Sequence, residues 1–78
     1  MQELIEYIAK SLVERPEAVK VFLLPEAGRT IVRLQVAAAD MGKVIGKGGR
    51  IAEAMRTLLK VTSAREGTRA VLEIAPEE

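Results

Sequence analysis

Two glycines, Gly46 and Gly49, stand between two stretches of helical pattern and constrain this chain more than any other feature. Glycine lets the backbone take a positive φ and lets another molecule approach the chain closely. An apolar pair, Val44 and Ile45, precedes the first glycine, and apolar residues at helical spacing follow the second. The sequence therefore predicts a short helix, a sharp glycine turn and a longer helix in succession.

The residues of this loop favour an anion. A helix that begins directly after such a loop presents N–H groups without helical partners, and its dipole attracts negative charge. Lys47 and Arg50 add full positive charge at the loop, and Lys43 lies close by in the sequence. These features predict a phosphate clamp. The alternative is an ordinary glycine-rich turn between two helices.

The spacing excludes two other phosphate-binding loops. A Walker A loop beginning at Gly42 would need a second glycine where Lys47 stands. The dinucleotide fingerprint G-x-G-x-x-G fails because Ile51 occupies its last glycine position. What remains is G-x-x-G between two helical segments. This is the loop of KH domains, which clamps the backbone of about four nucleotides.

Composition limits the other functions open to the chain. A length of 78 residues predicts a single domain over residues 1–78, and 49% hydrophobic residues suffice for a core. The absence of Cys and His removes thiolate sites, the commonest metal ligand and the usual general base. We therefore expect no metal, no cofactor and no catalytic residue. Without a signal-peptide core or an apolar run of membrane length, we also expect a cytoplasmic protein with no membrane partner.

Positive charge gathers around and after the glycine loop. Residues 43–69 contain seven basic and two acidic side chains, whereas residues 1–42 carry a net charge of −1 and residues 70–78 one of −3. Such clustering is typical of a surface that contacts nucleic acid. For Arg56 and Lys60 taken alone, an ordinary solvated helix face is at least as good an explanation.

The hydropathy pattern predicts six elements in the order αββααβ. Pro16 ends the first helix, and Asp40 is a suitable N-cap for the helix before the loop. Since a right-handed crossover makes the last strand parallel to its neighbour, we expect an α+β fold with a three-stranded mixed sheet and three helices on one face. The expected elements are a helix over 2–14, strands over 18–24 and 30–36, a helix over 41–45, a helix from the loop to about 64, and a strand over 70–74, with 76–78 a frayed tail.

The first predicted strand is apolar on both faces, because Phe22 and Leu24 alternate with Val21 and Leu23. If the helices cover one face of the sheet, the other face becomes available for a contact. Phe22 and Tyr7 are the only aromatic residues, and neither lies near the glycine loop. We expect both in the core or at an interface, which disfavours recognition by base stacking.

The order of elements and the loop together resemble a type II KH domain. The chain is similar, over essentially all of its 78 residues, to the stand-alone bacterial KH-domain RNA-binding proteins of the KhpA family. The most specific part of the resemblance is the segment 44–50, Val-Ile-Gly-Lys-Gly-Gly-Arg. One position departs from it: many KH domains carry a large aliphatic residue three places after the second glycine, where this chain has Ala52.

The resemblance implies a groove for single-stranded RNA. One wall would be the helix over 41–45 with the loop, and the other would be the second strand, 31–36, with its edge groups. Amides around the loop would hold phosphates, while Val44 and Ile45 would support the groove or simply pack in the core. The candidate RNA-binding residues are Lys43, Val44, Ile45, Gly46, Lys47, Gly48, Gly49 and Arg50.

The predicted function is non-catalytic binding of single-stranded RNA, as a small RNA chaperone or post-transcriptional regulator. A clamp for four nucleotides binds weakly, so a second module is expected. The resemblance implies a homodimer or a second RNA-binding protein of the Jag/KhpB type. Two alternatives stay open: a protein-interaction scaffold that uses the KH fold, and binding of single-stranded DNA, because a phosphate clamp does not read the 2′-OH.

Overall fold

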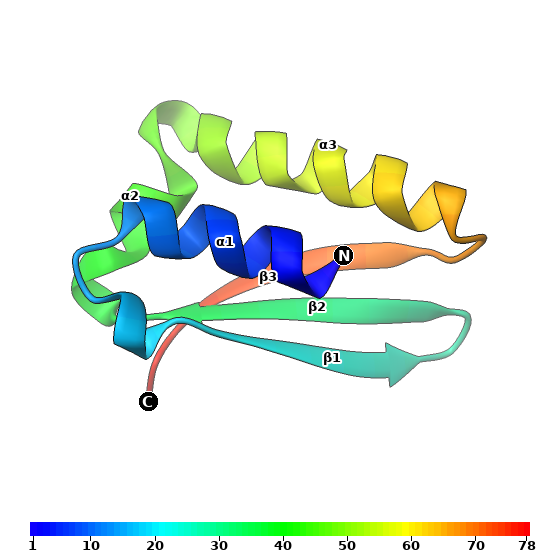
Figure 1. Cartoon of the computed structure of the whole chain (residues 1–78), viewed down its shortest axis with the longest axis horizontal. Coiled ribbons are helices and arrows are strands. Elements are labelled where there is room, and N and C mark those ends of the chain that lie inside the picture. The colour runs from blue at the N-terminus through cyan, green and yellow to red at the C-terminus, as the bar shows by residue number, and fades with distance from the viewer.

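The computed structural model describes all residues 1–78 and confirms the αββααβ order of an α+β fold (Figure 1). Helices α1 and α3 lie along one face of the sheet, and α2 packs at one end of it. Short 3-10 turns precede β1, α2 and α3. The elements are α1 (Gln2–Leu12), η1 (Pro16–Ala18), β1 (Lys20–Glu26), β2 (Arg29–Val36), η2 (Ala38–Asp40), α2 (Met41–Ile45), η3 (Lys47–Gly49), α3 (Arg50–Arg65) and β3 (Ala70–Pro76).

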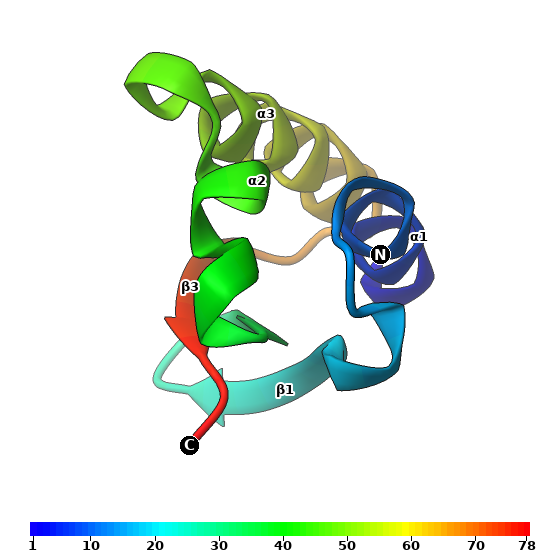
Figure 2. The ribbon, with the colours of Figure 1, turned by 90° about the vertical axis from the view of Figure 1, so that its left-hand side faces the viewer.

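The sheet has the strand order β1-β2-β3, with β2 in the centre. β1 runs antiparallel to β2 through a tight turn, and β3 runs parallel to β2 after the crossover through α2 and α3. Viewed end-on, the helices α1, α2 and α3 lie above β1, on one side of the sheet (Figure 2). Val32 of β2 is paired with Leu23 on one side and with Leu72 on the other. The expected mixed, three-stranded sheet is therefore confirmed.

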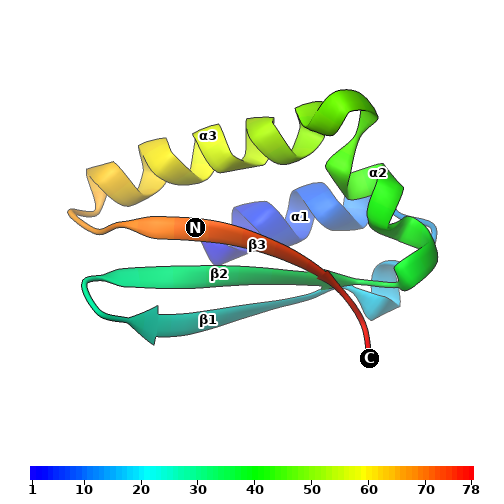
Figure 3. The ribbon, with the colours of Figure 1, turned by 180° about the vertical axis from the view of Figure 1, so that it is seen from behind.

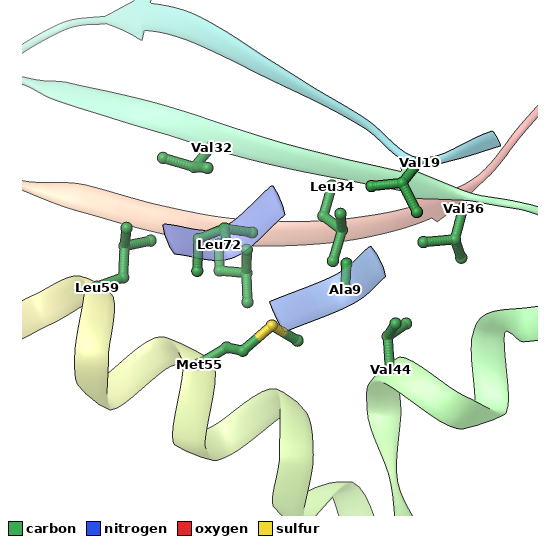
Figure 4. Close-up of a cluster of buried hydrophobic side chains, with 10 residues drawn as sticks. Ala9, Val19, Val32, Leu34, Val36, Val44, Met55, Leu59 and Leu72 are labelled. Atoms are coloured by element: carbon green, nitrogen blue, oxygen red, sulfur yellow. The ribbon is translucent and has the colours of Figure 1, made fainter. Parts of the chain in front are cut away.

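The core lies between the sheet and the helices (Figure 4). Alternate residues of β2, namely Val32, Leu34 and Val36, are fully buried on the helix side. Each large aliphatic side chain buried in this way contributes roughly 1.5–3 kcal/mol. The core cluster consists of Ile5, Ala9, Val19, Val32, Leu34, Val36, Val44, Met55, Leu59 and Leu72.

Asp40 does not cap α2 as predicted, since its side chain makes no hydrogen bond to the start of that helix. The buried carboxylate instead accepts hydrogen bonds from the backbone N–H groups of Glu14 (3.2 Å) and Arg15 (3.1 Å). α1 ends at Leu12, two residues earlier than expected, because the chain turns away before Pro16. The two amides released by this turn are satisfied by Asp40 from a distant part of the sequence.

The ends of two strands also differ from prediction. β1 begins at Lys20, because the residues after Arg15 first form the 3-10 turn η1. The predicted frayed tail is wrong for Pro76 and Glu77. Pro76 belongs to β3, and the amide of Glu77 donates to the carbonyl of Val36 at 2.7 Å. The Glu77 carboxylate also accepts from Arg15 at 3.4 Å, so pairing with β2 holds the end of the chain.

Neither aromatic residue belongs to the core. The Tyr7 side chain projects from α1 with 71% of its surface exposed, and Phe22 is 43% exposed on the sheet face away from the helices. The aliphatic residues of β2, α1 and α3 fill the space between the layers without them. The expectation that Tyr7 or Phe22 lies in the core is therefore wrong. Their place at an interface remains a prediction.

We expect Asp40→Ala to lower the free energy of unfolding by about 2–3 kcal/mol, because it leaves two backbone amides without an acceptor. Asp40→Asn should cost less, since its amide oxygen can still accept one of the bonds. Urea unfolding at neutral pH measures both effects. Glu14→Ala is the matched control: its side chain is exposed, and its removal should change stability by less than about 0.5 kcal/mol. Equal stability of Asp40→Ala and the wild type would contradict this role.

Candidate nucleic-acid interface

The loop between α2 and α3 depends on three glycines with positive φ. Gly46 has a φ of 79°, Gly48 one of 65° and Gly49 one of 76°. Residues with a Cβ rarely adopt this left-handed region, because the side chain meets the backbone. The three glycines allow the chain to leave α2, form the single turn η3 and enter α3 within four residues.

The glycines differ in what surrounds them. A Cβ added at Gly46 would lie 2.6 Å from Cγ1 of Ile51, so the backbone of Gly46 is packed directly against the first turn of α3. A Cβ at Gly48 or Gly49 would meet no atom within 4 Å. Gly46 therefore closes the loop against the protein, whereas Gly48 and Gly49 expose backbone to an incoming molecule.

Two amides of the loop have no partner in the protein. The N–H of Gly49 donates to the carbonyl of Gly46 at 3.1 Å, and that of Arg50 donates to the carbonyl of Lys47. The amides of Lys47 and Gly48 donate to no protein atom. They lie immediately before the 16-residue helix α3, whose N-terminal dipole favours negative charge. This arrangement can hold one anionic oxygen or more by backbone hydrogen bonds.

The charged side chains around the loop fall into two groups. Lys47 and Arg50 are exposed and take part in none of the eight ion pairs of the structure. Lys43 points to the other side of α2, where its Nζ lies 3.8 Å from carboxylate oxygens of Glu14 and Asp40. The charge of Lys43 is therefore partly balanced, whereas the charges of Lys47 and Arg50 remain available to a ligand.

The apolar candidates support the loop from within. Val44 is fully buried in the core cluster, and Ile45 is half-buried. Ala52, the small residue at the position where related loops carry a large one, is also buried. Ile51 packs against the core as well as against Gly46. The large aliphatic contact is therefore made one residue earlier in α3.

The structure corrects the predicted second wall of the groove. β2 has neighbours on both sides and offers no free edge, so it cannot form that wall. The strand at the sheet edge beside α2 and α3 is β3 (Figure 3). The backbone of Thr30 in β2 is already bonded on this side, since its N–H donates to the carbonyl of Arg69 at 2.8 Å.

A groove of about 410 Å³ lies between α3 and β3. Arg56 and Lys60, four residues apart, line it from α3, and Arg69 lines it from the segment before β3. Arg56 lies about 9 Å along the helix axis from Arg50, at 1.5 Å per residue, so the groove begins within reach of the loop. Its lining is completed by Ser63, Ala64, Thr68, Ala70, Val71 and Leu72.

The sequence did not identify these groove residues as a site. The i,i+4 spacing of Arg56 and Lys60 was the available signal, but the same spacing describes any solvated helix face. Only the position of β3 shows that this side of α3 borders a groove. Both hydroxyl groups of the lining are engaged internally: Ser63 donates to the carbonyl of Lys60, and Thr68 donates to that of Ser63.

The shifted pKa values belong to a different part of the surface. Hydrogen bonding to Glu17, followed by the charge of Glu77, raises the pKa of the Arg15 guanidinium. The pKa of Glu17 is lowered by a hydrogen bond from its own backbone amide and by Arg15. These residues surround the start of η1, away from the loop. No group of three or more His, Cys, Asp or Glu side chains comes together, and no helix has the length and apolarity needed to span a membrane.

Comparison with known proteins gives the family. Residues 2–74 match the KH domain of KhpA and KhpB. This chain belongs to the KhpA/KhpB family of KH domains. A protein of Treponema pallidum named RNA-binding protein KhpA is 53% identical over 73 residues, which cover 94% of this chain and 91% of the relative.

Two further KhpA relatives extend the similarity. The protein of Caldanaerobacter subterraneus is 50% identical over 74 residues, covering 95% of this chain and 99% of the relative. That of Chlamydia pneumoniae is 44% identical over 78 residues and covers both chains completely. Each is also named RNA-binding protein KhpA. The loop and groove described above therefore belong to a KhpA/KhpB-type KH domain.

In this KhpA/KhpB-family domain we expect Gly46→Ala to lower the free energy of unfolding by about 2–5 kcal/mol. A left-handed backbone costs a non-glycine residue about 1–2 kcal/mol, and overpacking against Ile51 adds about 1–3 kcal/mol. Gly48→Ala is the matched control, because its φ is also positive but its Cβ would meet open space. Its cost should stay near 1–2 kcal/mol. Denaturant unfolding of both variants measures the loss in free energy of unfolding. Equal losses at Gly46 and Gly48 would refute the loop geometry described above.

Proposed function

We propose that this chain binds single-stranded RNA without catalysing a reaction, with phosphates at the glycine loop and bases in the groove between α3 and β3. The observation that carries the proposal is the pair of unpartnered amides at Lys47 and Gly48, exposed before α3 in a KhpA/KhpB-family domain. The names of the relatives support the same ligand, since each is an RNA-binding protein.

The loop suits a phosphate by shape as well as by charge. The absence of side chains at Gly48 and Gly49 lets a phosphate oxygen reach the backbone N–H groups. Lys47 and Arg50 provide two positive charges that no acidic side chain balances. Hydrogen bonds to a charged acceptor are about twice as strong as neutral ones, so a few such contacts suffice to anchor a strand.

The groove suits unpaired bases. Val71 and Leu72 give its β3 side an apolar lining, and Arg56, Lys60 and Arg69 supply hydrogen-bond donors at its margins. No aromatic side chain lines it, so bases would be held by aliphatic packing and by hydrogen bonds to their edges rather than by stacking. Because paired bases hide those edges, we expect single strands to bind better than duplexes.

A clamp for about four nucleotides makes few contacts, so we expect micromolar affinity for the lone domain. Useful selectivity then requires a second site on the same RNA. A second copy of the chain, or a second RNA-binding protein of the KhpB type, would provide it and could raise avidity by roughly 10²-fold. Acting in this way, the protein would serve in the cytoplasm as an RNA chaperone or a post-transcriptional regulator.

The double variant Lys47→Asp/Gly48→Asp should abolish RNA binding while the fold is retained. Two carboxylates at the clamp repel phosphate, and both positions face solvent. Fluorescence anisotropy with a random single-stranded RNA measures binding, and circular dichroism checks the fold. The same titration with DNA of equal sequence distinguishes a specific RNA ligand from single strands in general.

The matched control for that variant is Lys10→Asp/Gly28→Asp. It makes the same change in net charge, and Gly28, like Gly48, has a positive φ and open space around its Cβ position. Lys10 lies on α1, outside the groove lining. Binding by the control should stay within about twofold of the wild type. Undiminished binding by the folded loop variant would refute the proposed phosphate site.

A second prediction concerns the groove. Lys60→Glu should weaken binding of single-stranded RNA by about tenfold, because it replaces a donor by an acceptor beside the bound strand. Arg65→Glu is the control: it makes the same charge change on α3, but Arg65 does not line the groove. Its effect should be about twofold or less, reflecting only the net charge. Equal losses for the two variants would show that the groove contributes no local contact.

A further inference from the structure

Two positive charges in the groove between α3 and β3 are balanced by no acidic side chain. Lys60 lines the groove from α3 and Arg69 from the segment before β3, and neither takes part in any of the eight ion pairs. Arg56, the third basic residue of the lining, has a carboxylate oxygen of Glu53 3.6 Å away. The lining contains no Asp, Glu, Asn or Gln. The two unbalanced side chains donate hydrogen bonds and accept none.

The hydroxyl groups of the lining do little to offset this excess of donors. Ser63 is only 3% exposed, and its hydroxyl donates to the carbonyl of Lys60. Thr68 is exposed, and its hydroxyl donates to the carbonyl of Ser63 at 3.3 Å. The Thr68 oxygen is therefore the one accessible side-chain acceptor of the groove, and it stands next to Arg69 in the sequence.

The free edge of β3 adds one backbone donor and one backbone acceptor. β3 pairs only with β2, where the N–H of Thr30 donates to the carbonyl of Arg69. Backbone groups alternate in direction along a strand, so the N–H and carbonyl of the next residue, Ala70, point to the free edge. Ala70 is half-buried and lines the groove. Its two backbone groups are therefore available to the edge of a base.

A strand edge alone does not choose among the four bases. Uracil and guanine present a keto oxygen beside a ring N–H, whereas cytosine and adenine present an amino group beside a ring nitrogen that accepts. Either pair fits one N–H and one carbonyl of the backbone, in opposite orientations. A nearby cation removes this equivalence, because it attracts a keto oxygen and repels the hydrogens of an amino group.

We propose that the groove selects the keto bases uracil and guanine over the amino bases cytosine and adenine, and that Lys60 and Arg69 determine this selection. The inference rests on the proposed function, since it names the bases that the groove accepts. Ala70 holds the edge of the base by its backbone, and the two cations bind the keto oxygen. Guanine offers a cation a second acceptor, N7, beside its keto oxygen.

The comparison of oligouridylate with oligocytidylate tests this selection in the wild type. Both RNAs are about eight nucleotides long, twice the length of the clamped segment, and are titrated at neutral pH by fluorescence anisotropy. Uracil and cytosine rings are equal in size, and the two strands carry the same number of phosphates. The contribution of the glycine loop therefore cancels in the ratio of dissociation constants. Oligouridylate should bind about tenfold more tightly than oligocytidylate.

The double variant Lys60→Gln/Arg69→Gln tests whether these two residues make the selection. A glutamine amide both donates and accepts, so the two RNAs should bind this variant within about threefold of each other. Lys20→Gln/Arg65→Gln is the matched control, with the same loss of charge at two exposed positions outside the groove. It should weaken the binding of both RNAs equally and keep the tenfold ratio, because lost net charge acts on phosphates and not on bases.

The outcomes separate this inference from the proposed function. Equal binding of the two RNAs, with both abolished by Lys47→Asp/Gly48→Asp, would overturn the selection of keto bases and leave the proposed function standing. Tighter binding of oligocytidylate would overturn the selection in the same way. A preference for oligouridylate that survives in the folded Lys60→Gln/Arg69→Gln variant would overturn the role of the two cations. A wild type that binds neither RNA would overturn the proposed function together with the inference.

Discussion

The contact between Gly46 and Ile51 holds α2 and α3 in the arrangement on which the proposed RNA-binding surface depends. With 2.6 Å between Cγ1 of Ile51 and the position of an absent Cβ, no side chain fits at Gly46. This close approach turns the chain sharply after α2 and places the start of α3 beside exposed backbone. Two amides, at Lys47 and Gly48, then remain without partners at the positive end of a long helix. The loop is thus packed against α3 at Gly46, whereas the Cβ positions of Gly48 and Gly49 border open space.

α3 joins the two halves of the proposed site. Its first turn carries the loop and Arg50, while Arg56 and Lys60 line the groove that the same helix forms with β3. Burial of Met55 and Leu59 against the sheet fixes the rotation of the helix, and so determines which basic residues face β3. The core therefore positions the charges, and a rigid helix keeps the loop and the groove in a fixed relation.

The sequence predicted the order of elements because each has a local signal: helical spacing before Pro16, alternation in β2, and glycines at the loop. It did not predict that β3 is the edge beside α3. Whether β3 pairs with β1 or with β2 depends on contacts between distant residues. One of them is the 2.6 Å ion pair of Arg33 with Glu73. Asp40 was misassigned for the same reason. A local motif favoured a helix cap, but amides 25 and 26 residues away are its partners.

The most direct test of the account is an NMR titration of the isotope-labelled protein with a short single-stranded RNA. Binding at the loop and groove predicts shifts of the amide signals of Lys47, Gly48 and Gly49, together with signals from Arg56 to Lys60 and from Arg69 to Leu72. The signals of Phe22 and Arg33, on the open face of the sheet, should remain in place. Shifts confined to that open face, with the loop signals unmoved, would contradict the account.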